Sequence, residues 1–488
     1  MTYRTRRIIF WALVGLFIII SPLTVFYSKG YRFDFQKWEV FKIGGLNLQI
    51  KINDAKIFIN NRLKAQSGGL LYSSNFFKLL PGTYKIRIAK ENYQDWQKDL
   101  TVKPNLVTDA YNIILFPQKT QVTQITNEPA AFFLFSPNNV KILLAALDAT
   151  SSLTAIKISL TDKKGNPIEN PYIFPLKGLK NPQVKILDGR WSANSDSFIL
   201  KIEVNKKIQW LTLTHNSKNR EPALIDEEIK KSLETFKKTV GPPKISASLD
   251  ELFFNPANPK ELLFLAGDDI YAFDLETKII KNAKINNNPA LGVELFYVEG
   301  KNVWWIDKTG IIKKNDLNVN LIKEIFRIPN FATSSADNYR FVAWDDTFGI
   351  YTKNGIYLYA KKSGGEFIFL EGQITLAKFS PDGKKLLYLK NGEAVVQYLE
   401  DIKTGDIKKV GDQELIMNGV KNAAWLKTSD YLILVIDNSI NIAELDGRSD
   451  RNIFEIIKTE PSIIFYNPDN DQIYYLDDDG LLKTASLK

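Results

Sequence analysis

The sequence contains no cysteine and only one histidine, His215, in 488 residues. Without cysteine the chain has no disulfide bond, no thiolate nucleophile and no cysteine-ligated zinc or iron–sulfur site. A single histidine excludes a multi-histidine metal site, and any Ser-His-Asp triad would have to use His215. A large part of known catalytic side-chain chemistry is therefore excluded by composition alone.

Motifs for a cofactor or a catalytic centre are also missing. No glycine-rich phosphate loop follows a strand and opens a helix. His215 stands in "LTLTHNSKN", with no nucleophile signature nearby, so a surface turn is expected for it. Asp477-Asp478-Asp479-Gly480 and Asp268-Asp269 lack the alternating ligand spacing of a calcium loop, and Asp-Gly is ordinary hairpin chemistry. The sequence predicts no catalytic, metal-binding or cofactor-binding residue, no cofactor and no enzyme activity.

Overall composition is that of a folded chain. Hydrophobic residues make up 44% and charged residues 24% of the sequence, and the length allows two or three domains. Lysine and arginine outnumber aspartate and glutamate by 64 to 55, a net charge of +9 that is spread along the chain. We therefore expect no nucleic-acid partner. Loose attraction to anionic envelope polymers or lipid headgroups fits this charge better.

Residues 8–27, "IIFWALVGLFIIISPLTVFY", carry no charge and are long enough to cross a bilayer as a helix. Trp11 and Tyr27 suit the two membrane interfaces. A cleaved signal peptide is the alternative, but no small-x-small motif follows the apolar run. The sequence predicts that residues 1–28 form a cytoplasmic tail and a single-pass, uncleaved membrane anchor.

Orientation is less strongly specified than the anchor itself. Arg4, Arg6 and Arg7 precede the apolar run and favour a cytoplasmic N-terminus. Basic residues also follow the run, and these are Lys29, Arg32, Lys37 and Lys42. Charge alone therefore favours only modestly the placement that we expect, with the bulk of the chain outside the cytoplasm at the cell membrane.

Alternating apolar residues separated by turn residues fill residues 43–117. We predict strands at 45–52, 55–59, 83–89, 100–102 and 110–116, with turns at Asn53-Asp54, Asn60-Asn61 and Pro81-Gly82. The result is a compact antiparallel β-sandwich. Tyr93 and Trp96 are expected to close one end of its core, although an aromatic pair that grips a sugar or peptidoglycan strand is the alternative.

The second half of this segment resembles the PEGA domain, a small surface β-sandwich with the pattern pG-x-y-x-v-x-v-x-x-x-G-Y. The matching residues are Pro81, Gly82, Tyr84, Ile86, Ile88 and Tyr93. Asn92 replaces the usual glycine, a mild change because asparagine tolerates positive φ. The family's name-giving tetrapeptide would fall on residues 52–55, where only Ala55 is retained. The resemblance implies an extracytoplasmic binding or spacer module without catalytic residues.

From about residue 120 to residue 488 one pattern recurs, two strands joined by a Gly, Asp or Asn turn. The copy at 376–410, "LAKFSPDGKKLLYLKNGEAVVQYLEDIKTGDIKKV", reads as four strands. Eight such hairpins at intervals of about 40 to 60 residues predict a β-propeller of about eight blades, with seven as the alternative. The last copy lacks its fourth strand, which residues 121–125 could supply and so close the ring.

The "FSPDGKKL" of this copy resembles the repeat of the Tol-associated periplasmic protein and related WD-type propellers. Such repeats imply a fold rather than an activity. One insertion, near residues 226–240, is predicted to be helical, with Asp226 as the N-cap and Gly241 with Pro242-Pro243 as the stop. Its apolar stripe is expected to pack on the rim of the propeller, and docking of a partner is the alternative. The stripe consists of Ile229, Leu233, Phe236 and Val240.

Trp304 and Trp305 are adjacent on a predicted strand, so one should face the core and the other should face outward as a candidate for ligand stacking. The fold class is all-β with one transmembrane helix, a small sandwich and a propeller. The expected function is a bacterial membrane-anchored scaffold that presents the propeller to a protein or envelope polymer. A hydrolase that uses paired carboxylates on glycans or peptides, and an envelope sensor or assembly factor, are the alternatives.

Overall fold

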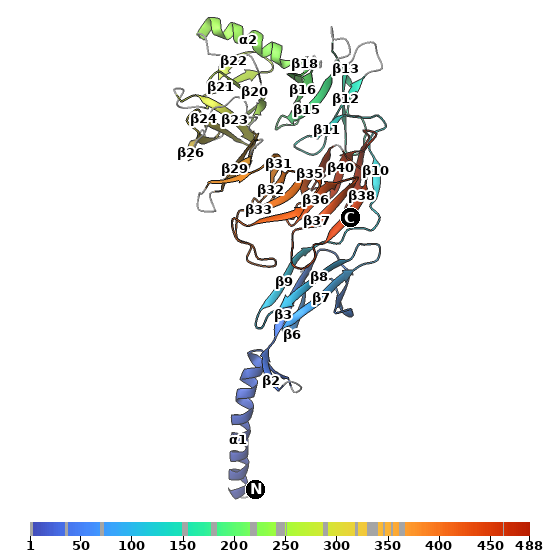
Figure 1. Ribbon diagram of the computed structural model, residues 1–488, viewed down its shortest axis with the longest axis vertical. Coiled ribbons are helices and arrows are strands. Elements are labelled where there is room, and N and C mark those ends of the chain that lie inside the picture. The colour runs from blue at the N-terminus through green and yellow to red at the C-terminus, as the bar shows by residue number, and fades with distance from the viewer. Residues whose placement is uncertain are drawn as a thin grey trace.

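The computed structural model describes residues 3–34, 38–68, 73–148, 155–176, 183–214, 222–240, 249, 251–285, 291–317, 321–328, 340–344, 347–352, 355–360, 367–461 and 463–488. Figure 1 shows three parts along the long axis of the molecule: the helix α1, a small pair of β-sheets and a ring of β-sheets. The small sheets lie between the helix and the ring.

Helix α1 (Tyr3–Ser28) begins before the apolar run and so includes the preceding Arg4, Arg6 and Arg7. None of the residues of α1 is buried. Within the described chain it is the one helix whose length and apolar composition suffice to cross a membrane, and a signal sequence shares both properties. Two residues separate it from a hairpin of β1 (Tyr31–Asp34) and β2 (Glu39–Lys42). That hairpin is a two-stranded sheet of its own.

Two sheets form the small domain, which we call the sandwich. One has the strand order β5 (Arg62–Gln66), β4 (Lys56–Ile59), β7 (Gly82–Ala89) and β8 (Trp96–Val102). The other has the order β6 (Ser73–Leu79), β3 (Gly44–Ile50) and β9 (Val107–Ile113). Alternate residues of these strands, such as Ile57, Ile86 and Ile88, fill the space between the sheets.

The expectation of a wholly antiparallel sandwich is wrong at one strand. β9 pairs with β3 in parallel. The chain leaves β8 in one sheet and crosses to the other before β9 begins, and this crossover gives β9 the direction of β3. The predicted turns are present: Asp54, Asn60, Asn61 and Asn92 all have positive φ, with a value of 65° at Asn92. Asparagine therefore takes the backbone conformation for which glycine is usual.

Eight four-stranded antiparallel sheets form the ring, and we number them as blades in chain order. Blade 1 has β11 (Phe132–Phe135), β12 (Ile142–Asp148), β13 (Ala155–Thr161) and β14 (Tyr172–Pro175). Blade 2 has β15 (Val184–Trp191), β16 (Ser197–Val204), β17 (Lys207–Thr214) and β18 (Ala223–Leu224). Blade 3 has β19 (Leu252–Asn255), β20 (Asn258–Ala266), β21 (Asp269–Asp274) and β22 (Ile280–Asn282). Blade 4 has β23 (Val293–Glu299), β24 (Asn302–Asp307), β25 (Ile311–Asp316) and β26 (Leu321–Arg327).

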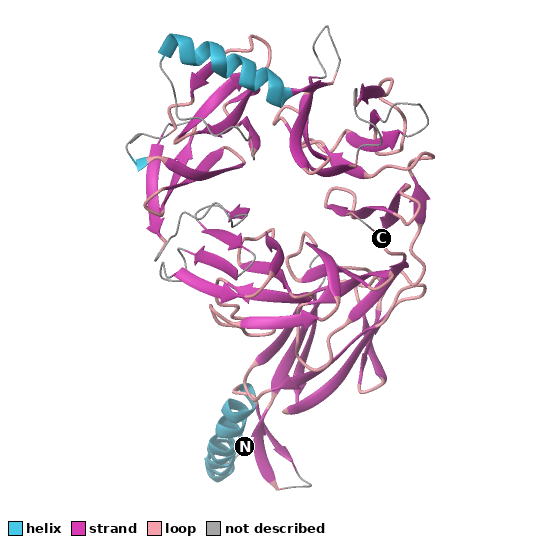
Figure 2. Cartoon of the chain, turned by 45° about the horizontal axis from the view of Figure 1, so that its top comes forward, coloured by secondary structure: helices cyan, strands magenta, loops and turns pink. Residues whose placement is uncertain are grey.

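The second half of the ring repeats the same plan. Blade 5 has β27 (Arg340–Trp344), β28 (Thr347–Thr352), β29 (Gly355–Ala360) and β30 (Phe367–Glu371). Blade 6 has β31 (Ile374–Phe379), β32 (Lys385–Lys390), β33 (Glu393–Tyr398) and β34 (Gln413–Met417). Blade 7 has β35 (Val420–Trp425), β36 (Tyr431–Ile436), β37 (Ser439–Glu444) and β38 (Ile453–Lys458). Blade 8 has β39 (Ile464–Asn467), β40 (Gln472–Leu476) and β41 (Leu482–Ser486), and Figure 2 shows the blades arranged in a ring.

The fourth strand of blade 8 comes from the other end of the propeller sequence. β10 (Val122–Gln124) pairs with β41 in antiparallel register. Two flanking backbone hydrogen bonds extend this pairing, from Ile125 N–H to Leu482 O at 2.8 Å and from Ser486 N–H to Gln121 O at 3.1 Å. The ring closes through the segment that the sequence predicts.

Each pair of neighbouring blades shares one apolar core. The core between blades 3 and 4 contains Phe253 and Trp305, and the core between blades 4 and 5 contains Trp304 and Phe348. A blade therefore buries both faces of its sheet, unlike an ordinary two-layer sandwich. The prediction of one outward tryptophan at 304–305 is wrong for this reason: Trp304 is 1% exposed and Trp305 is 0% exposed.

Helix α2 (Ile225–Val240) lies over blades 2 and 3, at the end of the molecule remote from α1 (Figure 1). Its residues Ile229, Leu233 and Phe236 pack against the apolar core that these two blades share, so the rim-packing expectation is confirmed for them. The predicted N-cap is wrong. Asp226 lies inside the helix and accepts a hydrogen bond from Trp210 N–H, and burial raises the pKa of its carboxyl. The predicted stop at Gly241 to Pro243 lies outside the described residues.

Candidate functional site

The sandwich is joined to the propeller at blade 7. Strand β8 is the outer strand of its sheet, so one row of its backbone groups lacks a neighbouring strand. The loop between β37 and β38 covers that edge. Asn452 donates to Gln97 O at 3.0 Å and accepts from Gln97 N–H at 3.1 Å, and Ser449 accepts from Asp99 N–H. Side chains of a propeller loop thus replace the missing strand.

Lys98 and Glu444 form a buried ion pair at the centre of this joint. Their side chains are 0% and 5% exposed, and Lys98 Nζ lies 3.2 Å from Glu444 Oε2. The carboxylate also accepts from Trp96 Nε1–H at 3.0 Å and from Asn452 at 2.7 Å, while Lys98 donates to Asp446 O at 2.6 Å. Burial raises the pKa of Glu444, and the charge of Lys98 offsets part of that effect. The pair belongs to a hydrogen-bonded network that spans the two domains.

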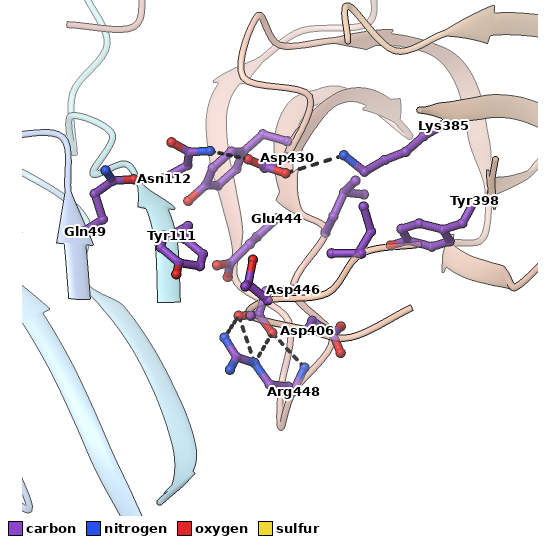
Figure 3. Close-up of a pocket in the computed structure, with 15 residues that line it drawn as sticks. Gln49, Tyr111, Asn112, Lys385, Tyr398, Asp406, Asp430, Glu444, Asp446 and Arg448 are labelled. Carbon is purple, nitrogen blue, oxygen red and sulfur yellow. Dashed lines mark hydrogen bonds and ion pairs between the residues drawn. The ribbon is translucent and has the colours of Figure 1, made fainter. Parts of the chain in front are cut away.

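A cavity of about 360 Å³ opens beside this ion pair, between the sandwich and blades 6 and 7 (Figure 3). On one side Asn112 donates to Asp430, which also lies 3.5 Å from Lys385 Nζ. On the other side Arg448 donates to both carboxylate oxygens of Asp446. Burial opposes ionisation of Asp446, but the hydrogen bonds and charge of Arg448, together with Lys98, lower its pKa. These charged groups have partners within the protein.

An apolar core continues across the joint. Phe116, at the end of the sandwich, lies against Tyr431 and Phe454 of blade 7, with ring centroids 5.8 and 5.1 Å apart. One cluster of buried residues extends from Leu46 and Ile88 in the sandwich to the interface between blades 7 and 8. Tyr431 OH also accepts from Ile114 N–H. The sandwich therefore shares its core with the propeller.

A second cavity, of about 480 Å³, lies where the inner strands of blades 2 to 5 converge. Six of its lining side chains are apolar or aromatic, and these are Leu187, Phe253, Leu295, Phe296, Tyr297 and Phe341. Its charged groups form one cluster: Glu251 lies 2.5 Å from Arg190 and 2.6 Å from Lys201, and Asp188 lies 3.3 Å from Arg190. The guanidinium of Arg190 stacks on Phe253, 3.8 Å from the ring centroid.

The positive charges beside Glu251 in this inner cavity favour the ionised form of its carboxyl. Burial alone would raise the pKa of its carboxyl, but the charges of Arg190 and Lys201 outweigh burial and lower it. Paired charges beside aromatic rings offer a ligand both hydrogen-bonding and apolar contacts. This cavity is the candidate binding site, whereas the buried ion pair and its neighbours at the joint hold two domains together.

The structure places the other predicted residues as follows. His215 lies outside the described residues. Asp477 accepts from the N–H groups of Asp479 and Leu481, as expected of a turn residue. Asp268 lies 2.5 Å from Lys308, again within turn structure. Within the described chain, no group of three or more His, Asp or Glu side chains is placed to hold a metal ion.

Trp96 belongs to the sandwich core and is fully buried, as predicted, while Tyr93 packs against that core from its edge. Sequence reasoning missed Lys98. The signal was available, because Lys98 alternates in phase with Trp96, Leu100 and Val102, which are all buried positions of β8. A lysine in core phase needs a buried acidic partner. Sequence could not show that this partner is Glu444, about 350 residues away.

No protein-family model matches the chain, and no curated protein is significantly similar to it. Among solved structures, the chain is similar to the β-propeller domain of Myceliophteria thermophila Cps50 (Swd1), with a TM-score of 0.40 and 10% sequence identity. The match covers 76% of this chain and 100% of that domain.

Proposed function

We propose that this protein is a membrane-anchored binding scaffold. In this proposal α1 is a single-pass anchor, the sandwich is a PEGA-like spacer, and the propeller is presented to a protein or envelope polymer outside the cytoplasm of a bacterial cell. The joint is the observation that carries the proposal. A spacer that shares its core and a buried ion pair with blade 7 holds the ring in one orientation relative to the spacer.

The inner cavity is the proposed contact site for the partner. It combines aromatic rings with ion-paired Arg190, Lys201 and Glu251, and paired charges of this kind suit binding of a polar ligand better than proton transfer. Its volume of about 480 Å³ is within the usual range of ligand pockets, roughly 300–1,000 Å³. An extended partner would insert one short segment there.

Cross-linking in intact cells tests this proposal. A photoreactive residue at Leu187, an exposed residue of the inner cavity, should capture a partner, whereas the same residue at Ile173 on the outer strand of blade 1 should not. Fractionation should place the protein in membranes until detergent is added, and protease added to spheroplasts should remove the propeller. Equal capture at both positions would contradict the cavity as the contact site, and release without detergent would contradict the anchor.

A hydrolase is the second candidate function, and one residue favours it. Burial raises the pKa of Glu299, at the end of the inner strand β23, and Tyr297 OH donates to its carboxyl at 3.2 Å. A carboxyl whose pKa is raised by burial is better suited than a free carboxyl to act as a general acid on a glycan. Incubation with peptidoglycan fragments and peptide libraries tests this candidate. Cleavage that Glu299→Gln abolishes would favour the hydrolase over the scaffold.

A further inference from the structure

The β1–β2 hairpin between α1 and the sandwich has one strongly apolar face. Its register pairs Tyr31 with Lys42 and Phe33 with Val40. Because side chains alternate along a strand, these four residues share one face of the hairpin, and Trp38, in the turn before β2, adds to this face through its contact with Phe33. Phe33 and Trp38 contact each other, with ring centroids 5.7 Å apart at 90°.

This face is open to solvent in the structure. Phe33 is 40% exposed, Val40 is 59% exposed and Trp38 is 79% exposed. The hairpin pairs with neither sheet of the sandwich. An isolated two-stranded sheet is at best marginally stable in water, and a cluster of exposed aromatic residues marks a surface that contacts something else.

The hairpin is fixed to the end of α1. Arg32 donates to Tyr27 O at 2.8 Å, and its guanidinium lies 3.4 Å from the centroid of the Tyr27 ring. The rings of Phe26 and Tyr31 lie 5.2 Å apart, edge to face. Figures 1 and 2 both show the hairpin projecting beside this end of α1, clear of the sandwich. The exposed face therefore has a defined position relative to the apolar helix.

The lengths of α1 and of the hairpin place this apolar face at the membrane surface if α1 spans the bilayer. Twenty uncharged residues at about 1.5 Å each extend roughly 30 Å, the thickness of the hydrocarbon core. The headgroup layer adds about 5–7 Å on each side. The hairpin starts two residues after α1, and strands of four residues are about 13 Å long. It is long enough to run through the headgroup layer.

We propose that the β1–β2 hairpin inserts its apolar face into the lipid interface of the membrane that α1 spans, and this inference rests on the anchor in the proposed function. Tryptophan, tyrosine and phenylalanine favour that layer. Lys42, whose ammonium lies 4.8 Å from the Tyr31 ring centroid, places its charge among lipid phosphates. The hairpin is thus a second membrane contact, which limits rotation and tilt of the sandwich about α1.

The absence of cysteine makes a direct test simple, because each introduced cysteine is the only one in these 488 residues. A nitroxide label attached to Val40→Cys lies on the apolar face, and a label attached to Glu39→Cys lies at the adjacent exposed position on the opposite face. Ile18→Cys reports on the middle of α1. The protein is reconstituted in vesicles of phosphatidylcholine and phosphatidylglycerol. Accessibility of each label to oxygen and to a water-soluble nickel chelate is measured by electron paramagnetic resonance.

The expected ratio of oxygen to nickel accessibility is highest at residue 18 and several-fold higher at residue 40 than at residue 39. Equal, water-like ratios at 40 and 39 with a buried label at 18 would overturn the hairpin proposal while the anchor stands. A water-like ratio at 18 would overturn the anchor itself. Spin–spin broadening at residue 40 that grows with the protein-to-lipid ratio would mean that a second copy of the chain covers the face, which also overturns the proposal.

Discussion

Blades 6 to 8 and blades 2 to 4 have the same four-stranded plan but are stabilised by different contacts. Blade 7 meets the sandwich through polar side chains such as the buried Glu444 and the half-buried Asn452, which are paired with groups of another domain. Blades 2 and 3 instead receive α2, whose Ile229 and Leu233 enter an apolar core. Each group of blades therefore carries the type of side chain, polar or apolar, that suits the element packed on it.

This difference separates two roles that a polar cluster on a propeller can have. At the joint, carboxylates are paired across a domain boundary, and their position is specific for one neighbour. In the inner cavity, the charges are paired within the propeller and leave an open space beside aromatic rings. The first arrangement connects domains, and the second can receive a ligand. Four predictions test this comparison, from the largest expected effect to the smallest.

Lys98→Met should have the largest effect. It leaves Glu444 buried without its cation, and breaking a buried pair in this way typically costs about 3–5 kcal/mol. Urea unfolding measures the loss, and hydrogen exchange should show it in β8 and blade 7 rather than in blades 2 to 4. Lys85→Met is the matched control, because Lys85 is exposed on neighbouring β7. Equal losses in the two variants would mean that the ion pair does not hold the joint.

Leu233→Ala should destabilise the opposite side of the ring. Removing a buried leucine side chain typically costs about 2–5 kcal/mol, and α2 can partly move into the space left, so about 2–3 kcal/mol is expected. Lys230→Ala, on the exposed side of the same helix, should be close to neutral. Hydrogen exchange should rise in α2, blade 2 and blade 3. Increased exchange at the joint would contradict the separation of the two sides.

Gly165→Ala tests ring closure. Gly165 has φ +86°, and a Cβ atom there would lie 2.1 Å from Ile125 O, at the end of β10. The left-handed conformation alone costs roughly 1–2 kcal/mol for alanine, and the clash with the backbone adds to that cost. Gly300→Ala is the control, with φ +56° and open space around its Cβ. Equal melting temperatures for the two variants would show that the end of β10 moves freely.

A pH series should distinguish the two acidic residues by sign. The folded-state pKa of Glu251 is lowered, so its stabilisation is present above about pH 4.5 and is lost as pH falls through the folded value. The pKa of Glu444 is raised, so its contribution decreases as pH rises above about 4.5. Glu251→Gln should flatten the acid limb of the stability profile, and Glu444→Gln should steepen it. Changes of the same sign would contradict the assigned shifts.

Local patterns were sufficient to predict most of the fold. Turn residues separated by alternating strands predicted eight blades, and the missing strand of blade 8 predicted its pairing with residues 121–125. The positive φ of Asn92 followed from its place in a turn pattern. These features depend on residues close in sequence, or on the requirement that a sheet edge be covered.

Features that depend on distant packing were not predictable in the same way. Both tryptophans at 304–305 are buried because each blade has a neighbour on both faces. Asp226 is inside α2 rather than before it because Trp210 of blade 2 supplies a backbone donor. The partners of Lys98 and the inner cavity arise from segments far apart in sequence. Alternation can mark Lys98 as buried but cannot identify its partner.

Strand β10 has a consequence for synthesis of the chain. About 360 residues separate it from β41, so at 5–20 residues per second the ribosome finishes β41 roughly 20–70 s after β10. During that time the backbone of β10 has no strand beside it. Its three residues, Val122 to Gln124, are all exposed even in the finished ring, and short, polar edges recruit foreign strands poorly. Strand β10 is therefore suited to remain unpaired until β41 of the last blade has been synthesised.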